Sequence, residues 1–469
     1  MRRFVSPAVI LLGTQMLAVG VFLWAVGKLT PLALPDTASY VEFPFGSWTD
    51  ALSHFRTPGY PLFLKAVGGV VPGDAAAPIV QFVAYCLGVM LFYRGLQSVC
   101  PEEWRRMAVS SSLLYANILH GDVNHLTTDT LAAAGGIGVT GLLLMCQASP
   151  THRWRLRVAI GLATFVTCLI RPAYLFLVVF VPVTGMLLSM IRPSRTGSAK
   201  REGMRAFVEL VPVTVLPLFA YCLLRWCVIG QFGLVSFGGY NLIGISGQWL
   251  DEHMLPELPV ASRPLAELAL QRQRLIREQT PDAPVLDPMN YMTLEMRYDE
   301  TIWRVFQPAA EELYGADYRR INSELRRLAS TLVRIRPKLY VLWLAKSARQ
   351  AVRLVVSDLV TNPAYLLLTV LCVLAQFART LTSSMASSEK SSMPVPPPKM
   401  NEASHGEPGE TLFLLVVSYA AFQLLLVILV CPPLGRMTDA AAVLLPTLLM
   451  NFLVHRLPRL RPCDTKPSG

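Results

Sequence analysis

The sequence has little charge for its length, and this shortage excludes most soluble folds. Charged residues account for 16% of the 469 residues and hydrophobic residues for 53%, and the mean hydropathy is +0.44. These values lie outside the range of ordinary soluble domains, so the bilayer is expected to be the main solvent. The formal net charge of +11 does not indicate a nucleic-acid partner. The basic residues cluster in short loops beside apolar runs, where they set membrane orientation.

Cysteine patterns typical of metal sites or disulfide frameworks are also missing. The nine cysteines fall mostly within or beside apolar runs, and their spacing fits no metal motif. The polar stretch 230–340 contains no cysteine, so no disulfide framework holds it. The first apolar run lacks a convincing small-residue cleavage site, and we interpret it as a retained anchor rather than a signal peptide.

What the sequence does contain is a series of apolar runs. A helix needs about 20 such residues to cross the bilayer core, and ten segments come close. We therefore predict an all-α polytopic membrane protein with about ten transmembrane helices, of which the third and fifth are the shortest. The ten segments are Val5 to Gly27, Pro78 to Leu96, Met107 to Leu119, Leu126 to Cys146, Val158 to Ile170, Ala173 to Ile191, Ala206 to Ile229, Leu359 to Phe377, Leu412 to Val430 and Thr438 to His455.

Lysine and arginine in the short loops predict the orientation, because such loops are retained in the cytoplasm. Basic clusters occupy every second loop, at 2–3, 94–106, 153–157 and 192–205, and ten crossings return the basic tail 456–461 to the same side. The first outer loop (28–77), the turn 120–125, the turn at Arg171, the stretch 230–340 and the turn at Arg436 then face outwards. This pattern predicts an inner-membrane protein whose polar groups gather on the outward-facing side.

Composition divides the chain into five parts. Residues 1–229 form a transmembrane module that includes the first outer loop, and residues 230–358 mix charge with apolar residues at helical spacing, which predicts a small outward-facing helical subdomain. Within it, 340–356 has the pattern of a juxtamembrane helix beside anionic headgroups. Residues 359–379 are a predicted transmembrane helix, 380–410 a Ser- and Pro-rich cytoplasmic linker, and 411–469 a helix pair with a basic tail.

The first outer loop carries the densest chemical information, in PDTASYVEF (35–43) and HFRTPGYPLFLKAVGG (54–69). A carboxylate at the membrane face can take a proton from an acceptor hydroxyl or amine, and Asp36 is the candidate. A guanidinium offers a planar donor fork to phosphate, which Arg56 and Arg171 are placed to supply. Pro58 and Pro61 fix two φ angles around a permissive glycine, so we predict a rigid bend there.

These motifs resemble the bacterial lipid-phosphosugar-dependent glycosyltransferases of the GT-C superfamily, which includes protein O-mannosyltransferases and aminoarabinose transferases. The resemblance is carried by an acidic residue soon after the first membrane helix, a tyrosine four positions later, and R-x-P-G-Y-P before an apolar run. It covers the first six or so helices, and the rest only by architecture. It implies a polyprenyl-phosphate-sugar donor, a glycan, lipid or protein acceptor, and surrounding membrane lipids, with no nucleic acid.

Later segments extend the resemblance. LTTDTLAA (126–133) is similar to a family segment that opens the fourth helix, with Asp129 in the acidic place, and Arg171-Pro172 matches an Arg-Pro at the end of the fifth helix. GRMTDAAAVLLP (435–446) echoes the last-helix motif weakly, with Arg436 kept as a phosphate ligand and Met437 in place of a tyrosine. Thr37 stands where the family often has a second acid.

Several candidate residues also have ordinary structural explanations. Tyr40 and Tyr60 are predicted substrate-binding residues, but tyrosines at this depth also serve as interfacial anchors. His120, Asp122 and His125 lie within six residues and suit acceptor or donor binding, a divalent ion or a simple turn. Their spacing fits no zinc motif, so no metal ligand is assigned and no cofactor is required. Asp129 suits substrate binding and equally the first turn of a helix.

The sequence therefore predicts an inverting glycosyltransferase and leaves two alternatives open. One is a transporter or flippase of lipid-linked sugars, although such proteins usually place charges within helices and often show repeated halves. The other is a non-catalytic protein of envelope assembly. The sugar, the prenyl carrier and the acceptor depend on the shape of the pocket and are not predicted.

Overall fold

The computed structural model describes residues 6–118, 123–148, 153–191, 198–279, 296–389, 408–433 and 435–456. Within these ranges the chain is helical, and the only extended pairing is an isolated bridge between Leu32 and His125. Seven helical segments of the described chain are long and apolar enough to cross a membrane, and an eighth is reached if the bent pair α16 and α17 forms one span. The chain is thus a multi-pass helical membrane protein, as predicted.

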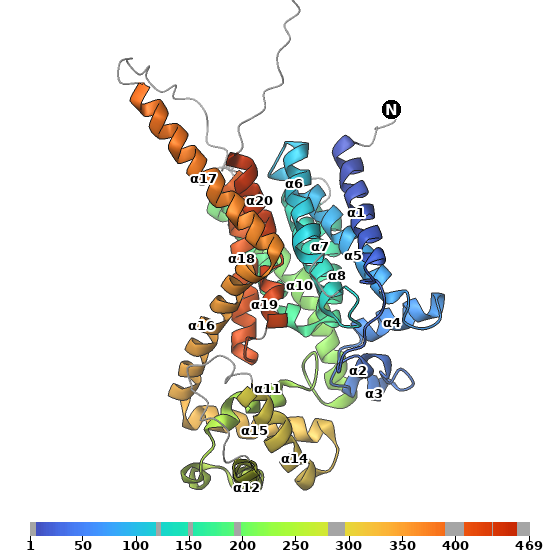
Figure 1. The fold of residues 1–469 in the computed structure, drawn as a ribbon. Helices are drawn as coiled ribbons and strands as arrows, with labels where there is room; N and C mark the ends of the chain where they lie inside the picture. The colour runs from blue at the N-terminus through green and yellow to red at the C-terminus, as the bar shows by residue number, and fades with distance from the viewer. Residues whose placement is uncertain are drawn as a thin grey trace, which may run out of the picture.

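The membrane bundle begins with α1 and ends with α20 (Figure 1). Its elements are α1 (Pro7–Ala25), α5 (Ala77–Gly95), η1 (Leu96–Ser98), α6 (Glu103–Leu113), the π-helix η2 (Leu114–Ile118), α7 (Asp129–Ala148), α8 (Arg153–Ile170), η3 (Pro172–Phe176), α9 (Leu177–Ile191), α10 (Ala199–Ile229), α17 (Pro363–Glu389), α18 (Pro408–Val430), α19 (Gly435–Ala442) and α20 (Leu445–Arg456).

The predicted helix 359–377 counts as a candidate span only together with α16, and two more of the ten predicted membrane helices are too short or too polar to count. These two correspond to α6 with η2 and to α8, which pack along α5 and α7 respectively. Helix α8 starts with three arginines in five residues, so only its second part is apolar. The helices predicted third and fifth are therefore present in the bundle, but the number of crossings is not ten by this measure.

Glycine lets α5 and α7 approach each other closely at the centre of the bundle. A Cβ on Gly88 would lie 2.5 Å from the carbonyl oxygen of Ala134, and one on Gly141 would lie 2.6 Å from the Leu91 backbone. Small residues at such contacts are how membrane helices gain packing without a hydrophobic driving force. This close pair forms the frame on which α6 and α8 rest.

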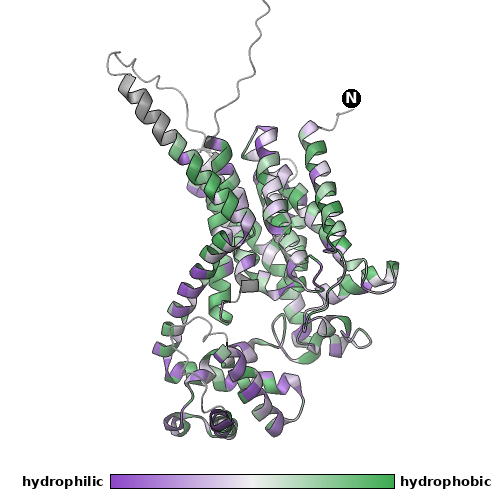
Figure 2. Ribbon diagram, viewed as in Figure 1, coloured by the Kyte–Doolittle hydropathy of each residue, from purple (hydrophilic) through white to green (hydrophobic). Residues whose placement is uncertain are grey.

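The remaining helices gather at the end of the bundle opposite the N-terminus, which we call the outer end (Figure 1). Figure 2 shows that they carry far more hydrophilic residues than the bundle. The first outer loop and the later outer helices thus share one side, as predicted. These elements are α2 (Ala38–Val41), α3 (Trp48–Ser53), α4 (Gly59–Val70), α11 (Gly238–Ser246), η4 (Gly247–Trp249), η5 (Glu252–Glu257), η6 (Val260–Ser262), α12 (Arg263–Gln279), the π-helix η7 (Glu300–Phe306), α14 (Gln307–Tyr314), α15 (Tyr318–Ile335) and α16 (Pro337–Thr361).

Residues 230–336 form the outer subdomain, which has a hydrophobic core of its own. The apolar stripe of α15 predicted from helical spacing, Ile321, Leu325, Leu328 and Leu332, is fully buried in it. Burying such a stripe against neighbouring helices is what stabilises an amphipathic helix. The end of α18 contributes to the same core, so the outer subdomain rests on the bundle.

The region after the outer subdomain departs from the prediction. The predicted boundary at 358 falls inside α16, which continues to Thr361 and then meets α17 at an angle of 84°. Helix α16 is not confined to the membrane surface, because its last turns line a cavity inside the bundle. Helix α17 continues to Glu389, so residues 380–389 of the predicted linker are helical. The last residues of that linker, 408–410, belong to α18, and 390–407 lie outside the described residues.

Candidate functional site

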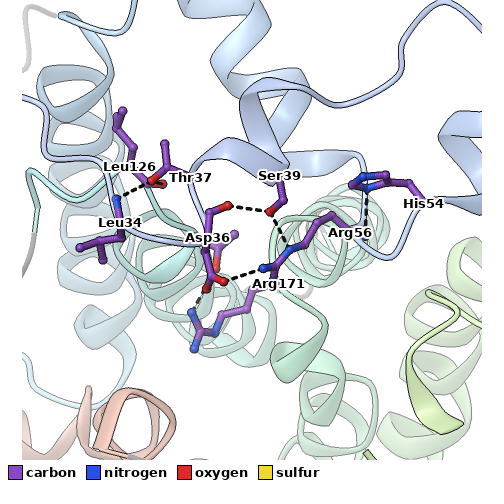
Figure 3. Close-up of polar contacts among 9 residues, drawn as sticks. Leu34, Asp36, Thr37, Ser39, His54, Arg56, Leu126 and Arg171 are labelled. Atoms are coloured by element: carbon purple, nitrogen blue, oxygen red, sulfur yellow. Dashed lines mark hydrogen bonds and ion pairs between the residues drawn. The ribbon is translucent and has the colours of Figure 1, made fainter. Parts of the chain in front are cut away.

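Backbone hydrogen bonds attach the first outer loop to the segment that precedes α7. Leu32 N donates to Asn124 O over 2.9 Å, and Leu126 N donates to Leu32 O over 3.0 Å. The Thr37 hydroxyl donates to Leu126 O over 3.1 Å (Figure 3). An ionised acid at position 37 has no proton to donate to this carbonyl. Thr37 therefore holds the turn that carries Asp36.

Asp36 and Arg56 form an ion pair on this loop (Figure 3). Arg56 Nη2 lies 2.7 Å from Asp36 Oδ1, and Arg56 Nε donates to Ser39 Oγ over 3.0 Å. The guanidinium carbon lies 4.8 Å from the centre of the Tyr40 ring. About a third of each side chain stays exposed, 35% for Asp36 and 27% for Arg56. The two residues predicted as base and phosphate ligand are thus brought together within reach of solvent.

The glycine of R-T-P-G-Y-P serves close packing rather than backbone freedom. Gly59 begins α4 and is not among the glycines with a positive φ angle. A Cβ at this position would lie 2.4 Å from the carbonyl carbon of Leu169 and 2.5 Å from Ile170 N. The start of α4 therefore touches the end of α8, one residue before Arg171. This contact brings the loop motif and the predicted Arg-Pro motif together.

Tyr60 belongs to the core beneath the loop, not to a ligand surface. Its side chain is fully buried, and its hydroxyl donates to Gln81 Oε1 over 3.0 Å. Tyr40 packs edge to face on Tyr60, with ring centres 5.1 Å apart. Burial raises the pKa of both phenols, so both stay neutral. The structure thus places Tyr60 in the core, its role in substrate binding stays a prediction, and neither tyrosine is an exposed interfacial anchor.

A second ion pair lies where α7 begins and α8 ends. Arg171 Nη1 contacts the carboxylate of Asp129 and donates to the Thr128 hydroxyl over 3.0 Å. Only 9% of the Arg171 side chain is exposed. Burial raises the pKa of the Tyr40 phenol, and the charge of Arg56 and then that of Arg171 lower it. Tyr40 therefore stands between the two ion pairs.

A cavity of about 220 Å³ opens beside the second pair. Three predicted site residues line it, namely His125, Asp129 and Arg171, whereas Asp36, Arg56 and Tyr40 do not. Leu34 of the first outer loop does reach its wall. The polar lining comes from both halves of the chain: Tyr85, Asn117, His125, Thr127, Asp129, Thr130, Arg171, Tyr174, Asp358, Asn362, Tyr365 and Asp439.

Asn117 fastens the two halves together beside this cavity. It lies in the π-helix η2, and its Nδ2 donates to Val443 O over 2.8 Å and to the Tyr85 hydroxyl over 3.0 Å. Its Oδ1 accepts from the Tyr365 hydroxyl over 2.9 Å. Single π-turns inside helices are frequent at functional sites. The sequence analysis missed Asn117, and its one sequence signal is a polar residue inside the apolar run 107–119.

Two carboxyl groups from the C-terminal half face the same cavity and were not predicted. Asp358 lies at the end of α16 and Asp439 in α19, and both line the cavity. Asp439 lies within the segment that resembles the last family motif, so that segment does reach the cavity. The sequence reasoning selected Arg436 there, whose side chain lies outside the described residues.

His120 and Asp122 also lie outside the described residues, so their predicted roles stay predictions. Among the residues that the structure does describe, no three His, Cys, Asp or Glu side chains are grouped so that they could hold a metal ion. Protein comparisons add no relatives: no family model, no curated protein and no solved structure matches this chain. Its function must be argued from the geometry of the residues themselves.

Proposed function

We propose that this protein is an inverting glycosyltransferase of the bacterial inner membrane, acting on the periplasmic face. It moves a sugar from a polyprenyl phosphate to a glycan, lipid or protein acceptor. The observation that carries the proposal is the partly exposed pair of Asp36 and Arg56 at the outer end of a membrane bundle. A carboxylate that can accept a proton and a cation that can bind phosphate are the two groups this reaction needs.

In the proposed reaction the acceptor oxygen or nitrogen attacks the anomeric carbon, and its proton passes to the Asp36 carboxylate. The bond between the anomeric carbon and the phosphate oxygen breaks, and its electron pair stays on the polyprenyl phosphate. Arg56 stabilises that charge, because a guanidinium has three nitrogens and its contacts with Asp36 and Ser39 use only Nη2 and Nε. A single displacement inverts the anomeric configuration.

The cavity beside the second pair, Asp129 and Arg171, gives the sugar a place. Its wall contains Arg171, and the Leu34 wall residue lies two positions before Asp36. Hydrogen-bonding side chains from several helices suit the hydroxyl groups of a sugar, since polar groups placed in a pocket fix ligand orientation. The donor phosphate then lies towards Arg56 and Arg171, and the prenyl chain stays in the surrounding lipid.

The test compares Asp36→Asn with Asp50→Asn, which neutralises an exposed acid in the same loop. Full-length proteins in nanodiscs are incubated with envelope fractions and a panel of polyprenyl-phosphate hexoses and pentoses, and released polyprenyl phosphate is measured. We expect Asp36→Asn to slow release by about 100- to 10,000-fold, as is usual for loss of a general base. Release by Asp36→Asn at the rate of the Asp50→Asn control rules the mechanism out.

A transporter of lipid-linked sugars is the rival function, and one observation favours it. Asp358 and Asp439 face the cavity from helices of the membrane bundle, and acidic residues at that depth often mark transport pathways. Proteoliposomes loaded with one polyprenyl-phosphate sugar separate the two functions. A transferase changes the lipid chemically when acceptor is present, whereas a transporter moves intact lipid between leaflets without acceptor.

A further inference from the structure

Arg225 is a fully buried arginine near the outer end of α10, with 1% of its surface exposed. Its Nε donates to Leu52 O over 2.9 Å, its Nη2 donates to Ser236 Oγ over 2.8 Å, and its Nη1 donates to Gly233 O. No acidic side chain of the described chain forms an ion pair with it. Burying an unpaired charge is costly, so three directed hydrogen bonds must compensate.

These bonds connect the first outer loop to the outer subdomain. Leu52 lies in α3 of the loop, while Gly233 and Ser236 lie in the segment that leads from α10 into α11. The contact continues further, because the Ser236 hydroxyl donates to Gln231 Oε1 and Gln231 Nε2 donates to Arg319 O over 3.5 Å. Arg225 thus reaches α15 through two polar side chains.

An aromatic contact returns from α15 to the loop. The ring of Tyr318, next to Arg319, lies 5.5 Å from the ring of Phe55, centre to centre. Tyr318 is itself stacked on Tyr240 of α11, with ring centres 4.8 Å apart and an angle of 12° between the planes. The segment that ends in Arg56 is therefore held at the Leu52 carbonyl by Arg225 of α10, which the outer subdomain orients through Gly233 and Ser236, and at the Phe55 ring by Tyr318 of that subdomain.

The part of the outer subdomain that carries Tyr318 is rigid because α11 and α15 pack closely together. Gly239 N donates to Asn322 Oδ1 over 2.8 Å, and a Cβ on Gly239 would lie 2.0 Å from the Asn322 carbonyl oxygen. Tyr240 is fully buried between the two helices. Tyr318 cannot shift without disturbing this contact, since packed interiors transmit displacement rather than absorb it.

We propose that the outer subdomain is a positioning element for Arg56, acting through Arg225 at Leu52 and through Tyr318 at Phe55. The proposal rests on the glycosyltransferase function and extends it to a region that the sequence motifs do not cover. Arg56 directly follows Phe55, so fixing the segment 52–56 fixes the direction from which the guanidinium meets Asp36 and a donor phosphate. A misplacement of about 1 Å in such a group can cost about 100-fold in rate.

The experiment uses the full chain in nanodiscs with the variants Arg225→Met, Arg225→Lys and Tyr318→Leu. The control is Arg274→Met, which removes an exposed ion pair with Glu252 on the far part of the same subdomain. Hydrogen–deuterium exchange of residues 47–58 reports the loop directly and needs no substrate. Transfer kinetics with a polyprenyl-phosphate sugar then give kcat, and the KM for donor and acceptor.

We expect exchange in 47–58 to become about tenfold faster in Arg225→Met and Tyr318→Leu, the effect of losing about one local hydrogen bond or contact. Arg225→Lys should fall between Met and wild type, because an ammonium cannot reach all three acceptors with one planar fork. In Arg225→Met and Tyr318→Leu the kcat/KM for the donor should fall about tenfold, while the KM for the acceptor stays unchanged. The Arg274→Met control should match the wild-type protein.

Unchanged exchange of 47–58 in both Arg225→Met and Tyr318→Leu overturns the proposal. So does faster exchange accompanied by wild-type transfer kinetics, because Arg56 then needs no such support. If Arg225→Met does not accumulate, Arg225→Lys and Tyr318→Leu decide by the same readouts. Absence of transfer by the wild-type protein counts against the glycosyltransferase function instead, and the exchange data then decide separately whether the subdomain holds the loop.

Discussion

The first outer loop and the junction of α7 with α8 each present an arginine–aspartate pair to Tyr40, in different surroundings. In the loop, Asp36 and Arg56 are 35% and 27% exposed. At the junction, Arg171 is only 9% exposed and Asp129 29%. A pair in contact with water loses little when one partner changes, whereas a buried pair depends on both partners.

This difference in exposure distinguishes a structural pair from a pair that can meet a ligand, which the sequence motifs do not distinguish. The junction pair fixes the start of α7 against the end of α8 and forms part of the cavity wall. The loop pair can exchange partners with an incoming phosphate at small cost. We therefore expect loop variants to damage transfer while sparing stability, and junction variants to damage stability first.

The largest expected effect is on transfer by Arg56→Met. Loss of a cation that stabilises developing phosphate charge should lower kcat by about 100- to 1,000-fold. The free energy of unfolding in nanodiscs should change by less than about 1 kcal/mol, since the pair is exposed. Release of polyprenyl phosphate and chemical denaturation measure the two quantities. A large loss of stability with intact transfer would reverse the comparison between the two pairs.

The next largest effect is on stability, in Arg171→Met. Asp129 is left without its cation near the cavity, and we expect the free energy of unfolding to fall by about 2–3 kcal/mol, below the range for fully buried pairs because Asp129 is partly exposed. Asp129→Asn in the same chain should restore part of the loss, since it removes the negative charge that Arg171 balances in the wild-type protein. Equal destabilisation by the single and double variants would show that the pair itself is not the cause.

A smaller change in stability is expected for Gly59→Ala. The added methyl meets the backbone of Leu169 and Ile170, and overpacking of this kind costs about 1–3 kcal/mol. It should also separate the loop pair from the junction pair and so reduce transfer. Gly46→Ala is the matched control, because a Cβ at Gly46 has nothing within 4 Å. Thermal unfolding of both variants measures the effect, and similar values for the two would remove the proposed role of Gly59.

The smallest effect concerns the pH dependence of the loop through His54. Burial, and then the charge of Arg56, lower the pKa of this imidazole from its ordinary value of 6.5. The unfolded chain therefore binds more protons below about pH 6.5, so the contribution of His54 to stability is present above that pH and is lost as the pH falls towards the folded-state pKa.

Hydrogen exchange of 47–58 at pH 7.5 and pH 5.5 measures this dependence, and we expect faster opening at the lower pH after correction for intrinsic rates. His54→Asn should weaken the dependence, because the asparagine amide does not titrate. The loop should stay in place, because the amide oxygen can accept the Arg56 backbone N–H as His54 Nδ1 does over 3.2 Å. His253→Asn, which removes an exposed imidazole, should leave it in place. A dependence that survives His54→Asn unchanged must arise from another group.

Local sequence patterns predicted the helices well where the pattern of apolar residues within one segment determined the helix. The apolar runs gave the bundle, and the stripe of α15 gave its buried face, because both depend on residues close together in the chain. The same reasoning predicted only a surface helix at 340–356, where α16 continues to Thr361, because a helix with Lys346, Arg349 and Arg353 on one side resembles a surface helix. Its last turns contact α19, a partner about eighty residues later in the chain, and this contact is not encoded in the local pattern.

The candidate site was predictable in part for the same reason. Asp36, Arg56, Asp129 and Arg171 carry recognisable motifs, and the structure brings each into one of two ion pairs. Tyr60 was assigned to substrate because its motif lies beside Arg56, but its side chain points into the core. Asp358, Asp439 and Asn117 stand alone in the sequence, so nothing local indicated that they meet.

The sequence by itself determined that this chain is a membrane protein and that its polar loops share one end of the bundle. It also determined that an acid and an arginine share the first outer loop. The tertiary structure alone decided which arginine stays in contact with water and which is buried, because burial depends on contacts with distant helices. It also decided that Gly59 is needed for close approach, that Thr37 holds the loop, and that Arg225 ties the loop to the outer subdomain. Each of these rests on a hydrogen bond or packing contact between segments far apart in the chain, which no local pattern encodes.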